Sequence, residues 1–127
     1  MNNPEIVLKK WLQAVNRGEI ESLLSLYNES AILIPTFSNR LLNSPDTLRE
    51  YFERLGSRNG LSVTLREKTL VFQSMYNDIW TMSGIYNWRF IVDGELLNFE
   101  ARFSYLVDLS KSSPIIHHHS SQIPRML

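Results

Sequence analysis

The first part of the chain carries hydrophobic residues with the period of an α-helix. They are Val7, Leu8, Trp11, Leu12 and Val15. Asn3-Pro4 precedes this run and Gly18 follows it, and these residue types are favoured at the N-cap, the first turn and the C-terminal cap of helices. A first helix is therefore predicted between these signals. The same spacing returns over residues 19–27 and predicts a second helix, bent against the first.

Helix signals appear once more in the middle of the chain. Ser44 is a suitable N-cap, Pro45 suits the first helical position, and Asp46 places an acid in the first turn. The apolar stripe that follows predicts a third helix to about Leu55, ended by Gly56.

Strands are predicted at residues 31–36, 61–74, 79–91, 95–109 and in a last strand that opens at Pro114. Asp93-Gly94 is a hairpin turn signal between two of them, and Pro35 places the first strand at a sheet edge. Three helices followed by long antiparallel strands predict an α+β fold. In it, a strongly curved, mostly antiparallel sheet packs on the helices and encloses a pocket.

Composition narrows the function classes. The 127 residues fit one domain, 1–127, and thirteen basic side chains balance thirteen acidic ones, so nucleic acid is not an expected partner. The absence of cysteine excludes disulfides and thiolate chemistry. There is no apolar run long enough for a membrane span and no signal-peptide core in the first twenty residues. We therefore expect a cytoplasmic protein without a membrane partner.

The segment HHHSS in the last strand is the main candidate for chemistry. Alternation places His117, His119 and Ser121 on one face and His118 and Ser120 on the other. Two histidines at i and i+2 can chelate a metal ion, but no third ligand is evident, so neither a metal nor another cofactor is predicted. Three interpretations stay open: a piece of affinity tag, histidines satisfied within a half-buried strand, and a polar cluster inside a pocket.

Other polar residues have two interpretations each. Arg102 either faces solvent in a cross-strand ion pair or points into the pocket, where its planar fork suits a carboxylate or bicarbonate. Tyr51 is either core packing or a phenol that faces the pocket. Thr36 ends the first strand, and Tyr86 belongs to the aromatic face of residues 79–91.

Several segments together resemble a known family: W-L-x-A-V-N-x-G, AILIPTFSN, LREYF, GIYNW, ARFSYLV and IIHHHSSQIP. From about Trp11 to Pro124 they are similar to the nuclear transport factor 2-like superfamily, within the branch of the calcium/calmodulin-dependent protein kinase II association domain. HHHSS with the upstream PTFSN resembles the iota class of carbonic anhydrases. The resemblance implies a cone-like barrel that assembles as a homodimer or larger homo-oligomer.

The iota-class resemblance also implies an activity. The chain would be a carbonate dehydratase, a lyase that interconverts carbon dioxide and bicarbonate without a metal. In this expectation His119 or Tyr51 deprotonates a water molecule, and the hydroxyls of Thr36 and Ser121 hold the bicarbonate. The implied catalytic residues are Thr36, Tyr51, His119 and Ser121, and the implied supporting pocket residues are Arg102, His117 and Tyr86.

Two other functions stay open. The first is a non-catalytic oligomerisation or small-ligand-binding domain that holds a small anion and assembles through aromatic residues of the sheet. The candidates for that interface are Trp80, Trp88, Phe90, Phe103 and Tyr105. The second is a small-molecule isomerase or cyclase on the same fold, because a fold does not decide function.

Overall fold

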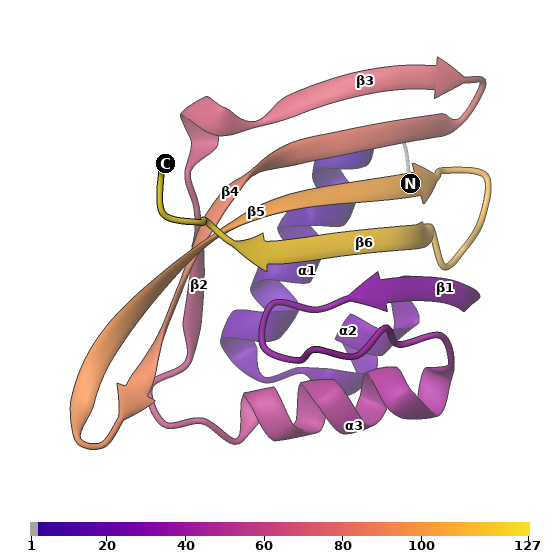
Figure 1. Cartoon of the computed structure of the whole chain (residues 1–127). Coiled ribbons are helices and arrows are strands. Elements are labelled where there is room, and N and C mark those ends of the chain that lie inside the picture. The colour runs from indigo at the N-terminus through magenta and orange to yellow at the C-terminus, as the bar shows by residue number, and fades with distance from the viewer. Residues whose placement is uncertain (1–2) are drawn as a thin grey trace.

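The computed structural model describes residues 3–127, and in it helices pack on one side of a curled sheet (Figure 1). The elements in this part of the chain are α1 (Pro4–Arg17), α2 (Ile20–Ser25), β1 (Tyr27–Ile34), α3 (Pro45–Gly56), β2 (Ser62–Leu65), a short 3-10 turn (Glu67–Thr69), β3 (Val71–Tyr76), β4 (Ile79–Val92), β5 (Glu95–Asp108) and β6 (Ile115–Gln122). The predicted α+β class is confirmed.

The capping signals act as the sequence predicts. The Asn3 side chain accepts a hydrogen bond from the backbone N–H of Ile6 at 3.0 Å, and Gly18 ends α1 with a left-handed φ of 67°. Ser44 caps α3 by accepting from the backbone N–H of Thr47 at 3.3 Å. These contacts satisfy backbone groups that helix ends leave unpaired, so they fix both boundaries.

The second helix is shorter than its spacing predicts. It ends at Ser25, and Tyr27 already belongs to β1, opposite Ile115 of β6. Tyr27 is buried there, and its hydroxyl accepts a hydrogen bond from the Trp11 indole at 2.9 Å. The tertiary hydrogen bond and strand pairing outweigh helical periodicity at this residue.

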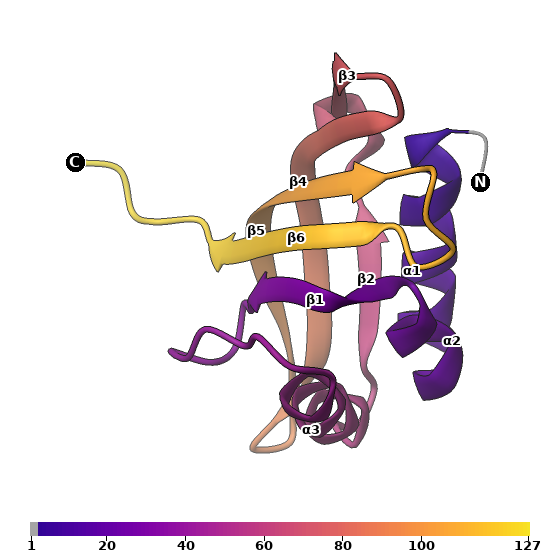
Figure 2. The same cartoon turned by 90° about the vertical axis from the view of Figure 1, so that its right-hand side faces the viewer.

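The sheet is curled but not closed, which corrects the expectation of a barrel. Its strand order is β1-β6-β5-β4-β2, with β3 also paired to β4, and β1 runs parallel to β6 whereas the other pairs are antiparallel. Figure 2 shows the sheet bending around α1, with α3 below it. Asp93 and Gly94 form the predicted β4–β5 turn with φ values of 51° and 80°.

The strand expected over residues 61–74 is interrupted. Residues 67–69 form the 3-10 turn, after which β3 pairs with a different part of β4 from that paired with β2. Thr69 holds the break, because its hydroxyl donates to the Arg66 carbonyl at 2.7 Å and accepts the Ile85 N–H at 2.8 Å. The two short strands β2 and β3 can therefore pair with separate parts of the one long, bent strand β4.

The core lies between α1 and the concave face of the sheet. Trp11 is fully buried and stacks on Tyr86, with ring centroids 5.5 Å apart. Four aromatic residues expected at a subunit interface are also buried in this core: Trp88, Phe90, Phe103 and Tyr105. That expectation is therefore wrong for these four. They lie on the sheet face that the helices cover, whereas Trp80 is half-buried.

Gly84 provides a test of this packing. A Cβ atom at Gly84 would lie 3.0 Å from Cζ of Phe103 and 3.2 Å from Oγ1 of Thr69. We expect Gly84→Ala to lower the free energy of unfolding by about 1–3 kcal/mol, the usual cost of overpacking, in urea unfolding curves. Gly56→Ala is the control, because its Cβ meets only Cδ1 of Ile20, at 3.6 Å. Equal stability of the two variants would contradict the close contact.

Candidate functional site

The last strand turns a different face inward from the one expected. His118 and Ser120 are both 2% exposed, whereas His119 is exposed and His117 and Ser121 are half-exposed. The grouping of these residues into two faces is confirmed. The assignment of His119 and Ser121 to the interior, with His117 beside them, is wrong.

A register shift explains the reversal. Ile115 pairs with Val107 and His117 pairs with Leu106, so β6 advances two residues where β5 advances one. Ile116 is the extra residue of this β-bulge, and it reverses the alternation that starts at buried Ile115. His118 consequently faces the core and His119 faces outward.

The bulge brings Ser120 to Thr36, one of the predicted residues. Their hydroxyls are hydrogen-bonded across the interior, between β6 and the segment that follows β1. Tyr51 of α3 lies beside them, and its hydroxyl accepts the backbone N–H of Phe37 at 3.3 Å. The structure thus groups Thr36 and Tyr51 with Ser120 instead of Ser121.

His118 bridges two buried tyrosines. Its Nδ1 lies 2.7 Å from the Tyr27 hydroxyl and its Nε2 lies 3.1 Å from the Tyr86 hydroxyl. The ring also stacks on Tyr105 with centroids 3.9 Å apart. Tyr86 was expected as a supporting residue of a pocket. In the structure its hydroxyl is hydrogen-bonded to His118 in the core. Both ring nitrogens are occupied within the protein.

The hydrogen bonds around His118 have a consistent direction. Trp11 donates to the Tyr27 oxygen, so the Tyr27 proton is free to donate to Nδ1 of His118. A neutral imidazole then carries its proton on Nε2 and donates to Tyr86. The opposite tautomer would leave the buried Tyr27 proton without an acceptor, which costs about 1–3 kcal/mol.

Burial controls the protonation of these groups. It lowers the pKa of His118 well below its usual value, assisted by repulsion from His117 and His119. Burial raises the pKa of Tyr86, while hydrogen bonding to the hydroxyls of Ser120 and Thr36 partly offsets that rise. Burial also raises the pKa of Tyr51 to about 12. At neutral pH the histidine is therefore neutral and the phenols are protonated.

Arg102 does not reach this cluster. It is exposed on the outer face of β5, opposite Ser121, and its neighbour Glu100 forms an ion pair with Arg66. The solvent-facing position of Arg102 is confirmed, but the ion pair on this face joins Glu100 to Arg66 and does not include Arg102. Its role as a supporting pocket residue is wrong. Side chains alternate along β5, and since Ala101 and Phe103 occupy its inner face, Arg102 between them faces outward.

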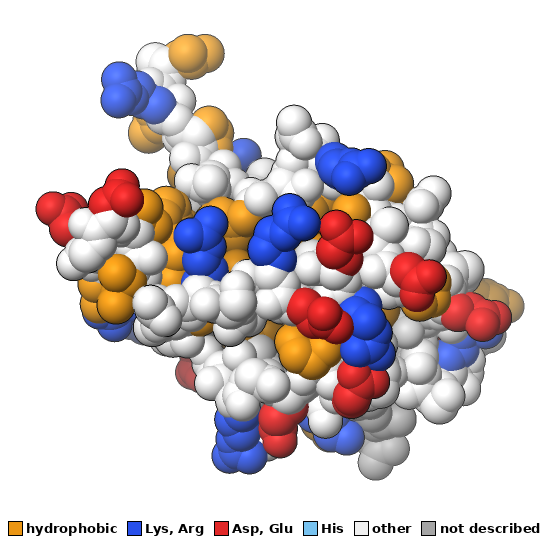
Figure 3. All heavy atoms as spheres, turned by 90° about the horizontal axis from the view of Figure 1, so that it is seen from below, with side chains coloured by type: hydrophobic (Ala, Val, Ile, Leu, Met, Phe, Trp, Pro, Cys, Tyr) orange, Lys and Arg blue, Asp and Glu red, His pale blue; other side chains and the backbone are white. Residues whose placement is uncertain are grey.

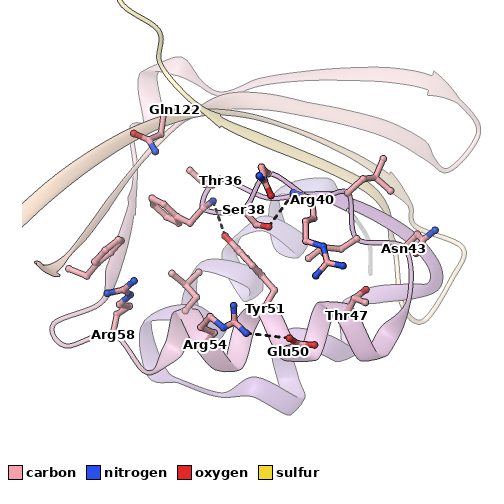
Figure 4. A pocket seen from close by; sticks show the side chains of 16 residues that line it. Thr36, Ser38, Arg40, Asn43, Thr47, Glu50, Tyr51, Arg54, Arg58 and Gln122 are labelled. Carbon is pink, nitrogen blue, oxygen red and sulfur yellow. Dashed lines mark hydrogen bonds and ion pairs between the residues drawn. The ribbon is translucent and has the colours of Figure 1, made fainter.

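A cavity of about 760 Å³ opens next to the cluster, between α3 and residues 36–43. Thr36, Phe37 and Tyr51 lie in its wall, and Phe90 and Gln122 close one end. Figure 4 shows side chains from both segments facing this space. Thr36 is therefore the link between the buried hydroxyls and the cavity.

The cavity lining is rich in positive charge. Arg40, Arg54 and Arg58 line it with only one carboxylate, Glu50, which lies 3.3 Å from Arg54. The Arg58 guanidinium also lies 5.5 Å from the centroid of the Phe90 ring. Figure 3 shows this side of the molecule, where basic side chains lie around visible hydrophobic ones. The sequence pattern does not mark these arginines as a group, because only the fold brings residues 36–43 opposite α3.

Three buried polar atoms lack a hydrogen-bond partner among the described residues: Asn87 Oδ1, Trp88 Nε1 and the Tyr105 hydroxyl. Trp88 packs edge-on against Phe37, a residue of the cavity wall. Within residues 3–127, no three His, Asp or Glu side chains converge as ligands for a metal ion. The interior site is thus built from hydroxyl groups, an indole and one imidazole.

Comparison with known protein families gives a clear assignment. The model of the calcium/calmodulin dependent protein kinase II association domain matches residues 4–124. The chain belongs to this family. No curated protein matches it in a sequence search. The expected superfamily branch is therefore confirmed.

Solved structures support the same fold. A protein from Xanthomonas campestris, provisionally described as an association domain of this kind, superposes with a TM-score of 0.85 at 22% identity, over 96% of this chain and 86% of that one. A nuclear transport factor 2-like protein from Streptomyces avermitilis, provisionally described as a dehydratase, superposes with a TM-score of 0.80 at 13% identity, over 95% of this chain and 94% of that one. A protein with a cystatin-like fold from Caulobacter vibrioides superposes with a TM-score of 0.78 at 11% identity, over 94% of this chain and 87% of that one.

One further finding concerns membranes. In the described part of this association-domain chain, no helix is long and apolar enough to cross a bilayer.

The buried histidine predicts a pH-dependent stability. Unfolded His118 has an ordinary pKa near 6.5, whereas burial lowers the pKa of the folded residue. Below about pH 6.5 the unfolded chain therefore binds the proton more readily. The free energy of unfolding falls by up to about 1.4 kcal/mol per pH unit until the folded pKa is reached.

Urea unfolding between pH 8 and pH 5 measures this slope. His118→Gln removes the titrating ring and reduces the slope, whereas the control His119→Gln removes an exposed ring and retains it. An unchanged slope in His118→Gln would show that this residue is not the source.

Proposed function

We propose that the cavity binds a small oxyanion and that the protein interconverts carbon dioxide and bicarbonate without a metal. The observation that carries this proposal is the hydrogen-bonded pair of Thr36 and Ser120, one of which lies in the wall of a cavity lined by arginines. The resemblance of HHHSS and PTFSN to iota-class carbonic anhydrases supports the same activity.

The polarity of the hydrogen bonds favours an acceptor in the cavity. Trp11 donates to Tyr27, Tyr27 to His118, and His118 to Tyr86. Thr36 and Ser120 have two hydroxyl protons and share one hydrogen bond, so one hydroxyl proton of the pair is left to donate to another acceptor. Tyr51 also has a free proton, because its oxygen accepts from Phe37. Donors without local acceptors suit the oxygens of an anion.

The roles of the site residues follow from this polarity. His118 is a positioning residue, since both of its nitrogens are occupied and it fixes the direction of the series. Thr36 and Tyr51 donate to the oxygens of carbon dioxide as negative charge develops on them, and Ser120 holds the Thr36 hydroxyl in place. The arginines hold the bicarbonate product by charge.

In the reaction, a water oxygen forms a bond to the carbon of carbon dioxide and one C=O π bond becomes a C–O⁻ bond. The water proton passes to a buffer base in the open cavity. His118 does not take this proton, because its ring is enclosed and occupied. Tyr51 does not take it either, because its pKa of about 12 keeps it protonated at neutral pH. Without a strong base we expect a modest rate.

Adjacent serines test both the activity and the strand register. Ser120→Ala and Thr36→Val remove the paired hydroxyls, and we expect each to reduce carbon dioxide hydration about 10- to 100-fold in stopped-flow assays. Ser121→Ala is the matched control, because Ser121 faces outward and should leave the rate unchanged. A wild-type rate no higher than buffer, with and without chelator, would reject the activity. Equal losses at Ser120 and Ser121 would reject the site.

A second candidate function is homo-oligomerisation, which the family assignment favours. One observation supports it: half-buried or exposed aliphatic residues lie on the outer face of the sheet, on four of its strands. They are Ile32 on β1, Leu106 on β5, Ile85 on β4 and Val71 on β3. A second copy of the chain would bury these side chains, which face away from the helices.

Light scattering with size exclusion tests the assembly. We expect wild-type protein to form dimers or larger oligomers, and Leu106→Asp to shift it to monomer by burying a charge at the interface. Leu96→Asp is the control, since Leu96 is 48% exposed at the far β4–β5 hairpin. A monomeric wild type at micromolar concentration would contradict this candidate.

A further inference from the structure

The indole N–H of Trp88 is a buried hydrogen-bond donor without a partner. Trp88 is 2% exposed, and its Nε1 atom has no acceptor within residues 3–127. An indole nitrogen can only donate, so it gains nothing from the protons of neighbouring hydroxyl groups. A donor that stays unpaired in the interior is costly, and most buried polar groups in folded proteins have a partner. The Trp88 N–H therefore points to an acceptor that the protein itself does not supply.

Trp88 lies beside the hydroxyl pair that carries the proposed function. Burial raises the pKa of Tyr86, and the nearby hydroxyls of Ser120 and Thr36 partly offset that rise. The Trp88 indole has the same lowering effect, so it too lies close to the Tyr86 hydroxyl. The Trp88 ring also packs edge-on against Phe37, with centroids 5.7 Å apart, and Phe37 follows Thr36 in the cavity wall. The indole thus lies in the layer of side chains directly behind that wall.

Hydrogen-bond donors outnumber acceptors where these groups meet. Thr36 and Ser120 carry two hydroxyl protons and share one hydrogen bond, so one proton of the pair is left to donate. The Trp88 N–H is a second free donor. Tyr86 adds a proton and no free acceptor beyond the oxygen that His118 already uses. This arrangement suits a group that brings oxygens with several lone pairs.

An anion satisfies these donors better than a water molecule does. A water molecule accepts two hydrogen bonds, but it also brings two protons that need acceptors of their own. A carboxylate brings two acceptor oxygens and no proton, and bicarbonate brings three oxygens and one proton. The negative charge also strengthens each bond, because charge-assisted hydrogen bonds are roughly twice as strong as neutral ones.

We propose that the Trp88 indole N–H donates to one oxygen of a small planar oxyanion while the Thr36 hydroxyl donates to another. This role rests on the proposed function, in which the anion is bicarbonate, and it restricts the size of the ligand. Trp88 is not itself part of the cavity lining, so only an anion of few atoms, such as bicarbonate or formate, reaches both donors. Bulkier carboxylates stay in the open cavity among the arginines.

The indole signals of the ¹⁵N-labelled protein test this contact by nuclear magnetic resonance. The chain has three tryptophans and so gives three indole N–H signals, which Trp88→Phe and Trp80→Phe assign. Titration with sodium formate, and separately with sodium bicarbonate, should move the Trp88 proton downfield to a saturating value, because hydrogen bonding deshields it. Sodium chloride at equal ionic strength and the bulky carboxylate pivalate should not. The Trp11 signal should stay constant, because its N–H already donates to Tyr27.

The two phenylalanine variants also test the contribution to affinity. Trp88→Phe should weaken formate binding about tenfold, the effect of losing one hydrogen bond to an anion, as measured by the shift of the Thr36 backbone amide. Trp80→Phe is the matched control, since it makes the same change at a half-buried tryptophan and should bind formate as wild type does. Circular dichroism records whether each variant is folded. If Trp88→Phe does not fold, the wild-type indole signal still decides the question.

Several outcomes would overturn the contact. A Trp88 signal that stays in place with both formate and bicarbonate would show that the N–H has another environment, such as the face of a neighbouring ring. An equal shift with chloride or pivalate would reject a site for small oxyanions. The hydration assay is a separate readout. Hydration with an unmoved Trp88 signal would reject this donor and retain the activity, whereas a saturating shift without hydration would support the donor and reject the activity.

Discussion

A single unpaired residue in the last strand controls which groups meet inside this molecule. Ile116 is the extra residue of a β-bulge between the pairs Ile115–Val107 and His117–Leu106. Since side chains alternate along a strand, one extra residue exchanges the two faces of everything that follows it. The exchange turns His118 and Ser120 inward and leaves His117, His119 and Ser121 outside. Bulges are frequent beside functional sites, where they redirect side chains in this way.

The buried histidine then connects four elements. Trp11 belongs to α1, Tyr27 to β1, Tyr86 to β4 and His118 to β6, and their polar atoms form one hydrogen-bonded series. A buried polar group is costly when unpaired, so each member depends on the next for its partner. The series therefore fixes the orientation of the rings and the tautomer of the imidazole. It also directs the Tyr86 proton away from the imidazole, because His118 donates to the Tyr86 oxygen.

Only a few residues connect the cavity with the buried hydrogen-bonded series. Thr36 shares a hydrogen bond with Ser120 and lines the cavity, while Tyr51 lines it and accepts from Phe37. Arginines from α3 and from residues 36–43 add positive charge on the open side. The fold of the association-domain family provides the hollow, whereas these particular side chains decide what it can bind. The outer face of the same sheet points away from the helices and is the surface proposed for contacts with another copy.

The amino-acid sequence by itself determined the helix boundaries at Asn3, Gly18 and Ser44, the β4–β5 turn, the α+β class and the two-face grouping of HHHSS. Each of these is a local property of caps, turn residues or periodicity. Tertiary structure alone decided that Tyr27 leaves its helix, that residues 61–74 split, and that the arginines meet across a cavity. It also decided which face of β6 is buried, because a bulge arises from pairing with another strand and leaves no mark in the alternation itself.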